Sequence, residues 1–117
     1  MRTDTLIKTF HAPASVEGYR IVTLAVGVNT VETANAVTDP LIGVTTSIGS
    51  MDNGRCDVIV GGISEIKIGG SVTRGDVLTT DASGRAVTSG AGTDRIIGLA
   101  LQDAVLDDIA SILVAQG

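Results

Sequence analysis

The chain is poor in the side chains that most binding and catalytic sites require. Its 117 residues include one Cys, one His, one Phe, one Tyr and no Trp, and aromatic residues make up 2% of the composition. Proteins that bind nucleic acids neutralise phosphates with basic residues and stack bases on aromatic rings. Because the chain has few rings and a net charge of −5, we expect no nucleic-acid binding.

Two further absences exclude broad classes of protein. The single cysteine, Cys56, cannot form an internal disulfide or supply a cysteine-rich zinc site, and we expect it to be buried in a core. No apolar run approaches the roughly 20 residues that a membrane-spanning helix needs, and the N-terminus lacks the layout of a secretory signal. We therefore expect a protein that neither spans a membrane nor is secreted.

Recognisable catalytic patterns are missing as well. Histidine is the commonest general acid or base, and the only histidine, His11, stands two residues before a proline at the edge of a strand-like segment. No serine lies within a Gly-x-Ser-x-Gly motif, and Asp103, Asp107 and Asp108 do not follow the spacing of a calcium loop. We predict that the chain has no catalytic residues, no cofactor and no metal site, and that it is not an enzyme.

The residues that are abundant favour β-structure. Valine, threonine and isoleucine are among the most frequent residues, beside 15 glycines, and hydrophobic residues make up 44% of the chain. Side chains branched at Cβ suit strands, and glycine supplies turns. We predict an all-β fold, a small β-barrel or jelly-roll-like sandwich, with strands at 3–10, 20–28, 31–37, 41–46, 55–60, 63–68, 76–80, 85–88, 96–101 and 109–115. A helix over residues 99–113 stays open as an alternative because apolar residues there have near-helical spacing.

The second half of the chain resembles the first. Residues 42–44, Ile-Gly-Val, correspond to residues 97–99, Ile-Gly-Leu, and residues 56–60 correspond to residues 110–114. Two copies are too few for a solenoid, so we predict two similar β units that face each other within one domain. The domain is expected to span residues 15–117, with units at about 15–62 and 71–117.

Four residues of the second unit are predicted to have structural roles in turns. They are Gly75, Asp76, Asp81 and Gly84. Glycine adopts positive φ without strain, and an aspartate side chain accepts hydrogen bonds from nearby backbone amides.

Residues 1–14 are predicted to form an N-terminal arm outside both units. Residues 3–10 have strand propensity and end before Pro13, which lacks a backbone N–H. The arm either completes the sheet of another subunit, with Leu6, Ile7 and Phe10 at the interface, or pairs within its own chain as an edge strand. Positive mean hydropathy and a scarcity of large core residues favour a homo-oligomer that buries apolar surface between chains.

Residues 75–87, Gly-Asp-Val-Leu-Thr-Thr-Asp-Ala-Ser-Gly-Arg-Ala-Val, and residues 97–101, Ile-Gly-Leu-Ala-Leu, resemble the capsid decoration (cement) proteins of tailed bacteriophages. The resemblance covers about residues 15–117 and is most specific over 72–104. Residues 107–109, Asp-Asp-Ile, depart from the Gly-Asp step that is typical of the last turn in this family.

The resemblance implies a structural protein that is made in the host cytoplasm and binds the outer capsid surface of the virion. Its partner would be the major capsid protein, whose subunits it would hold together. The resemblance also implies a homo-oligomer, with a trimer preferred over a dimer.

The alternative function is a lipoyl/biotinyl-type carrier or small-ligand binding β module, because Val72, Gly75 and Asp76 also resemble a turn of those domains. Such carriers need a modifiable lysine at a hairpin tip. The chain has only Lys8 and Lys67, and Lys67 falls within a predicted strand. A trimeric β enzyme of nucleotide metabolism is a third possibility, weakened by the absence of a catalytic aspartate motif and of an aromatic stacking residue.

Overall fold

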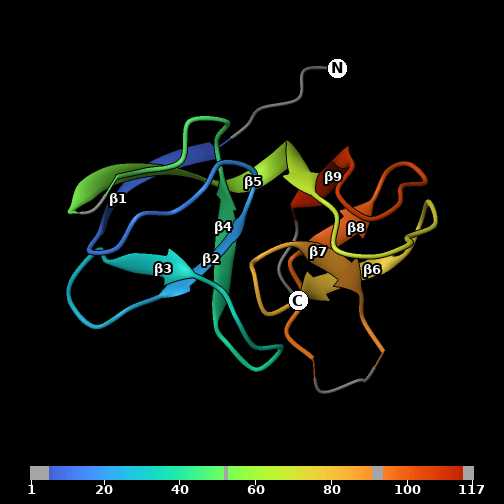
Figure 1. Cartoon of the computed structure of the whole chain (residues 1–117), viewed down its shortest axis with the longest axis horizontal. Coiled ribbons are helices and arrows are strands. Elements are labelled where there is room, and N and C mark those ends of the chain that lie inside the picture. Colours follow the sequence, from blue (N-terminus) through green and yellow to red (C-terminus); the bar gives the residue numbers. More distant parts are fainter. Residues whose placement is uncertain (1–5, 52, 91–93, 115–117) are drawn as a thin grey trace.

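The computed structural model describes residues 6–51, 53–90 and 94–114, which form nine strands and no helix (Figure 1). This confirms the predicted all-β fold. The segment 99–113 forms the end of one strand, a turn and another strand, so the helical alternative is wrong. The strands are β1 (Leu6–Ala12), β2 (Ile21–Leu24), β3 (Val31–Thr33), β4 (Leu41–Thr45), β5 (Gly54–Lys67), β6 (Val77–Thr80), β7 (Ala86–Thr88), β8 (Gly98–Ala100) and β9 (Ile109–Val114).

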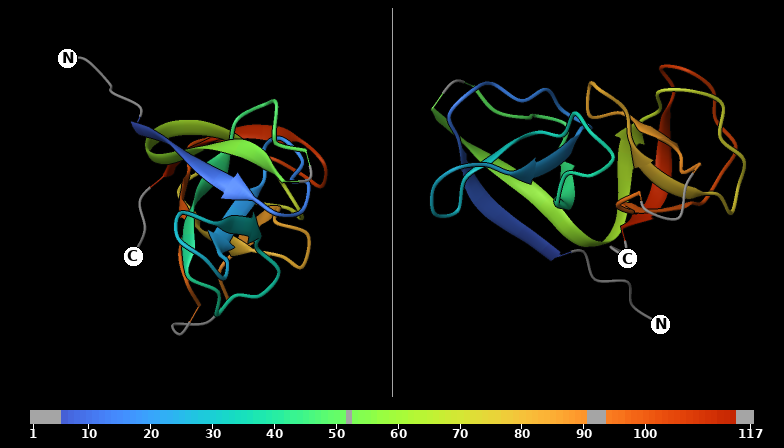
Figure 2. Two further views of the ribbon diagram at one scale, coloured as in Figure 1. Left: turned by 90° about the vertical axis from the view of Figure 1, so that its left-hand side faces the viewer. Right: turned by 90° about the horizontal axis from the view of Figure 1, so that it is seen from below.

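One long strand, β5, joins two halves of an antiparallel sheet. The strand order is β3-β2-β4-β5-β9-β8-β6-β7, with β1 also paired to β5 and the sheet not closed into a barrel. The first half of β5 pairs with β1 and β4, and its second half pairs with β9. The strand bends sharply between these halves, which Figure 2 shows from below, and Gly62 within β5 has φ +95°. The sequence analysis predicted two separate strands, at 55–60 and 63–68, whereas the structure has one strand that bends between these segments.

The two units repeat one pairing scheme. An antiparallel bridge between Val16 and Ser50 in the first unit has its counterpart between Val72 and Ala104 in the second. A parallel bridge between His11 and Thr30 has its counterpart between Ile68 and Ala86. In this scheme β1 occupies the place in the first unit that the second half of β5 occupies in the second unit.

The strand β1 is therefore part of the first unit and not a separate arm. It pairs along its whole length with β5, from Leu6 opposite Gly61 to Ala12 opposite Gly54. Ala12 is buried in the first core, and this packing holds β1 to its own chain. In this pairing scheme the first unit includes β1 and the second unit begins within β5, a different division from the predicted units at 15–62 and 71–117; residues 1–5 and 115–117 lie outside the described part of the chain.

Each unit has its own core, and the second core extends onto the first unit. The first core contains Ala12, Val16, Val22, Val31, Cys56 and Val58, with Phe10, Ile42 and Val60 packed against it. The second contains Ile66, Ile68, Val72, Leu78, Ala86, Ile97, Ala100, Ala104, Ala110, Ile112 and Val114, and also Ile21, Ala34, Leu41 and Val44 from the first unit. The second unit thus covers an apolar face of the first, and burial of this face stabilises the pair.

Backbone hydrogen bonds also join the units. The Ile21 amide donates to the Gly84 carbonyl at 2.7 Å, and the Lys67 amide donates to the Tyr19 carbonyl at 2.9 Å. The Arg20 guanidinium donates to the Ser83 carbonyl at 2.9 Å. The two units therefore form one body, in which the β6–β7 turn lies against β2.

Candidate functional site

The predicted turn residues lie in turns whose polar groups are paired. Gly75 and Gly84 have φ of +94° and +76°, a region that favours glycine. Oδ1 of Asp81 accepts hydrogen bonds from the amides of Ser83 and Arg85 at 2.8 and 2.9 Å. Its Oδ2 accepts a bond from the Arg85 guanidinium at 2.8 Å, so the carboxylate is fully used within its own turn.

Other acidic residues stabilise the backbone in the same way. Asp76 accepts hydrogen bonds from the Thr73 amide and the Thr88 hydroxyl, both at 2.9 Å. Asp103 accepts one from the Arg74 amide at 2.8 Å, and Asp108 one from the Val105 amide at 3.0 Å. These hydrogen bonds stabilise the turns, and each carboxylate is bonded within or beside a turn.

Two basic residues of the second unit, Arg85 and Lys67, lie beside carboxylates. The neighbouring Asp81 and Asp107 carboxylates raise the pKa of Arg85 above its ordinary value, chiefly through the hydrogen bond that the Arg85 guanidinium donates to Asp81. Lys67 lies within β5, and its Nζ is 3.9 Å from an Asp107 carboxylate oxygen. Lys8 lies within β1. Neither lysine stands at a hairpin tip, which is where a carrier domain presents its modified residue.

The only histidine and the only cysteine of the chain have different surroundings. His11 is exposed on β1, and Cys56 is buried in the first core, where burial raises the pKa of its thiol. Among the described residues, no group of three His, Cys, Asp or Glu side chains is arranged to hold a metal ion. In the same part of the chain, no helix is long and apolar enough to cross a membrane.

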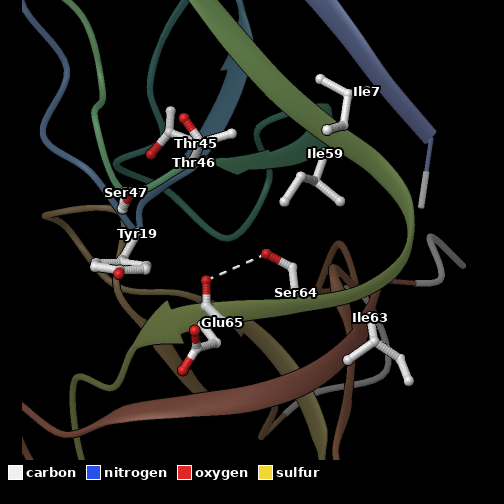
Figure 3. A pocket seen from close by; sticks show the side chains of 9 residues that line it. All are labelled: Ile7, Tyr19, Thr45, Thr46, Ser47, Ile59, Ile63, Ser64 and Glu65. Carbon is white, nitrogen blue, oxygen red and sulfur yellow. Dashed lines mark hydrogen bonds between the residues drawn. The ribbon is translucent and has the colours of Figure 1, made fainter.

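An open groove of ≈ 420 Å³ lies in the angle of the bent strand β5 (Figure 3). It is lined by Ile7, Tyr19, Thr45, Thr46, Ser47, Ile59, Ile63, Ser64 and Glu65. The Thr45 hydroxyl is already bonded to the Glu17 carbonyl at 2.9 Å, and the lining includes no cationic side chain. The groove is therefore lined by aliphatic side chains, hydroxyl groups and one carboxylate, and without a cationic side chain in its lining it is poorly suited to phosphate.

The three residues predicted for the arm interface have different surroundings. Leu6 pairs with Gly61 in the β1–β5 ladder. Phe10 is half-buried against the first core, with Lys8 Nζ 5.6 Å from its ring centroid, so it serves its own chain. Ile7 is 56% exposed and lines the groove.

The sequence analysis did not single out the exposed aliphatic side chains on the β4–β5 and β8–β9 loops. Ile48 and Met51 on the first loop are almost fully exposed, and Val105 and Leu106 on the second are also exposed. The two loops occupy the same place in the repeat. The signal that would have found them is the occurrence of large aliphatic residues inside both turn segments, where solvated polar residues are usual.

Comparison with known proteins shows a similarity in structure. No protein-family model and no curated protein matches the sequence. The fold is similar to that of the head fiber gp8.5 N base of bacteriophage phi29, with a TM-score of 0.75 and 18% sequence identity. The similarity covers 96% of this chain and 95% of that chain. The two chains therefore share a fold over nearly their whole lengths.

Proposed function

We propose that this chain is a structural protein of a tailed-phage virion that attaches to the outside of the head by binding the major capsid protein. The observation that supports this most strongly is the end-to-end similarity in fold to the base of a phage head fiber. The resemblance of residues 72–104 to capsid decoration proteins points to the same location. A non-enzymatic role is part of the proposal.

The exposed aliphatic residues of the β4–β5 and β8–β9 loops are the surface we assign to the capsid. Ile48 and Met51 on one loop, and Val105 and Leu106 on the other, expose large apolar side chains that gain free energy when a partner covers them. Because the loops are counterparts, one chain presents two similar contacts. A capsid repeats its binding site many times, so weak contacts of this kind can hold a lattice collectively.

The test uses heads of the phage that encodes this chain, prepared without the protein. Purified protein should sediment with the heads and saturate at a fixed number of copies. Ile48→Asp and Leu106→Asp should each reduce binding by at least about tenfold, because a charge is placed in an apolar contact. Ser71→Asp, on an exposed residue of another loop, is the matched control and should bind like the wild type. Absence of binding to the heads would overturn the proposal.

The similarity to a fiber base favours a second candidate, in which the chain anchors a projecting structure and does not reinforce the shell. Heating protein-free and protein-loaded heads separates the two. A cement protein raises the temperature at which heads release DNA, whereas a pure anchor leaves that temperature unchanged.

A further inference from the structure

Tyr19 has a backbone conformation that is strained for a bulky side chain. Its φ is +60°, in the left-handed region that favours glycine. Tyr19 follows the bridge residue Val16 by three positions. Gly75, with φ +94°, follows the corresponding bridge residue Val72 by the same interval. The second unit thus has glycine at the position where the first unit has a strained tyrosine.

The backbone around Tyr19 is firmly held beside the groove in the bend of β5. The Tyr19 amide donates to the Thr46 carbonyl at 3.3 Å, and the Tyr19 carbonyl accepts a bond from the Lys67 amide at 2.9 Å. A Cβ atom on the preceding Gly18 would collide with the Ser47 carbonyl oxygen, so the segment lies tightly against the β4–β5 loop. Strained residues of this kind cluster at functional sites. Because Tyr19 lines the groove, we look for its role there.

Glu65 is the one acidic residue in the lining of the groove. It is exposed on β5, and among the described residues its carboxylate forms no ion pair. Lys67, two residues along the strand, lies 3.9 Å from Asp107 instead. In Figure 3, Tyr19 and Glu65 lie toward one end of the groove, and the three isoleucines of the lining lie toward the other. One end of the groove therefore combines an aromatic ring with a carboxylate.

This combination suits an organic cation, and a guanidinium group in particular. A guanidinium is planar, stacks on the face of an aromatic ring and donates paired hydrogen bonds to a carboxylate. The aliphatic stem of an arginine packs on apolar surface while its charged end stays polar, and Ile59 and Ile63 supply such surface in the groove. No cationic side chain lines the groove, so none repels a bound cation.

The groove is continuous with the surface assigned to the capsid. Thr46 and Ser47 line the groove at the start of the β4–β5 loop, and the next residue of this loop, Ile48, is 88% exposed. A protein that covers Ile48 therefore lies beside the groove. This continuity favours an arginine of the bound capsid protein over a free small cation.

We propose that the groove receives an arginine side chain of the major capsid protein, with its guanidinium against the Tyr19 ring and the Glu65 carboxylate. The source of the arginine rests on the proposed function, whereas the cation site itself rests on the geometry of the groove. Tyr19 is then a binding residue that is kept despite its strained backbone. The site adds to the capsid contact a charged component that salt weakens and that the aliphatic loops lack.

The fluorescence of Tyr19 tests the cation site without phage heads. The chain has one tyrosine and no tryptophan, so tyrosine emission reports on this groove alone. Titration at constant ionic strength with the peptide acetyl-Gly-Arg-Gly-amide should change the emission to a plateau, and acetyl-Gly-Gln-Gly-amide should leave it unchanged. Glu65→Gln should weaken binding of the arginine peptide by at least about fivefold, whereas Glu32→Gln, on an exposed residue of β3, should bind like the wild type. No response to the arginine peptide, or an equal response to both peptides, would overturn the site.

Sedimentation with protein-free phage heads tests the source of the arginine. Tyr19→Gly and Glu65→Gln should each reduce binding to the heads by at least about fivefold, and Glu32→Gln should not. Tyr19→Gly should leave the urea midpoint of unfolding unchanged or higher, because glycine accepts the positive φ, whereas a purely structural ring predicts a clear drop.

The outcomes separate this inference from the proposed function. Heads that bind the wild type and both groove variants equally well would overturn the capsid arginine and leave the proposed function intact. Heads that do not bind the wild type would overturn the proposed function together with this source of the arginine, and the peptide titration would still decide the cation site.

Discussion

Gly43 and Gly98 are counterparts in the two units, and each lies beneath the backbone of the neighbouring strand. A Cβ atom on Gly43 would collide with the carbonyl oxygen of Ile59, and one on Gly98 with that of Leu113. These oxygens belong to β5 and β9, which pair with β4 and β8. The glycines allow the strands of each unit to approach closely, which explains the shared Ile-Gly pair at 42–43 and 97–98.

The first prediction concerns this close approach. Gly98→Ala should lower the free energy of unfolding by at least about 2 kcal/mol, because the backbone of β9 must move away from β8. Urea denaturation followed by circular dichroism measures the loss. Gly90→Ala is the control, since a Cβ there meets nothing within 4 Å, and it should change stability by less than about 0.5 kcal/mol. Equal stability of the two variants would contradict the close packing at Gly98.

The second prediction compares two residues of β1. Phe10→Ala should cost about 1 to 3 kcal/mol of unfolding free energy, because the ring packs against the first core. Ile7→Thr, on an exposed residue of the same strand, keeps a β-branched side chain and should cost less than about 1 kcal/mol. If both variants are as stable as the wild type, β1 does not contribute to the fold in the way described.

The third prediction concerns Asp81. Asp81→Ala removes the acceptor of two backbone amides and of the Arg85 side chain, and should destabilise the protein by about 2 kcal/mol. Asp81→Asn keeps an oxygen for the amides and loses the charge that pairs with Arg85, so its loss should be smaller. Thermal denaturation of both variants in low and high salt distinguishes these contributions. An asparagine variant as unstable as the alanine variant would show that the ion pair dominates.

The fourth prediction concerns the thiol of Cys56. Burial raises its pKa, so at pH 8 a smaller fraction is thiolate than in an exposed cysteine, and reagents also cannot reach it. Labelling with a disulfide reagent should be at least about a hundredfold slower than for a free thiol. Adding urea above the unfolding midpoint should bring the rate to that of free cysteine. Rapid and complete labelling of the native protein would place the thiol at the surface.

The repeat could be recognised from sequence where the fold constrains residue type. The Ile-Gly pairs at 42–43 and 97–98 stand out because only glycine fits beneath the adjoining strand. The relation between β1 and the second half of β5 was not recognisable in this way. Their equivalent positions, such as Ile7 and Ile63 or Phe10 and Ile66, require only an apolar side chain, so little sequence similarity remains. Pro13 added a break that is typical of an arm.

The surfaces of the protein could not be predicted from the strand patterns. Ile21 and Val77 occupy the same position in their units and have the same chemistry, yet one is fully buried and the other is 46% exposed. The difference arises from how one unit packs on the other, which is a long-range property. The same limitation applies to the groove at the bend of β5, whose lining comes from β1, β4, β5, the β4–β5 loop and the segment before β2.

The shared strand β5 has a consequence for cooperativity. Its first half completes the first unit and its second half begins the second, so unfolding either unit removes partners from a strand on which the other depends. Local opening that stops at the boundary between the units is therefore unfavourable, and the chain should melt in a single calorimetric transition whose van't Hoff and measured enthalpies agree. For a solution of the protein under heat or denaturant, this means that partly unfolded copies are rare and that almost every copy is either fully folded or fully unfolded.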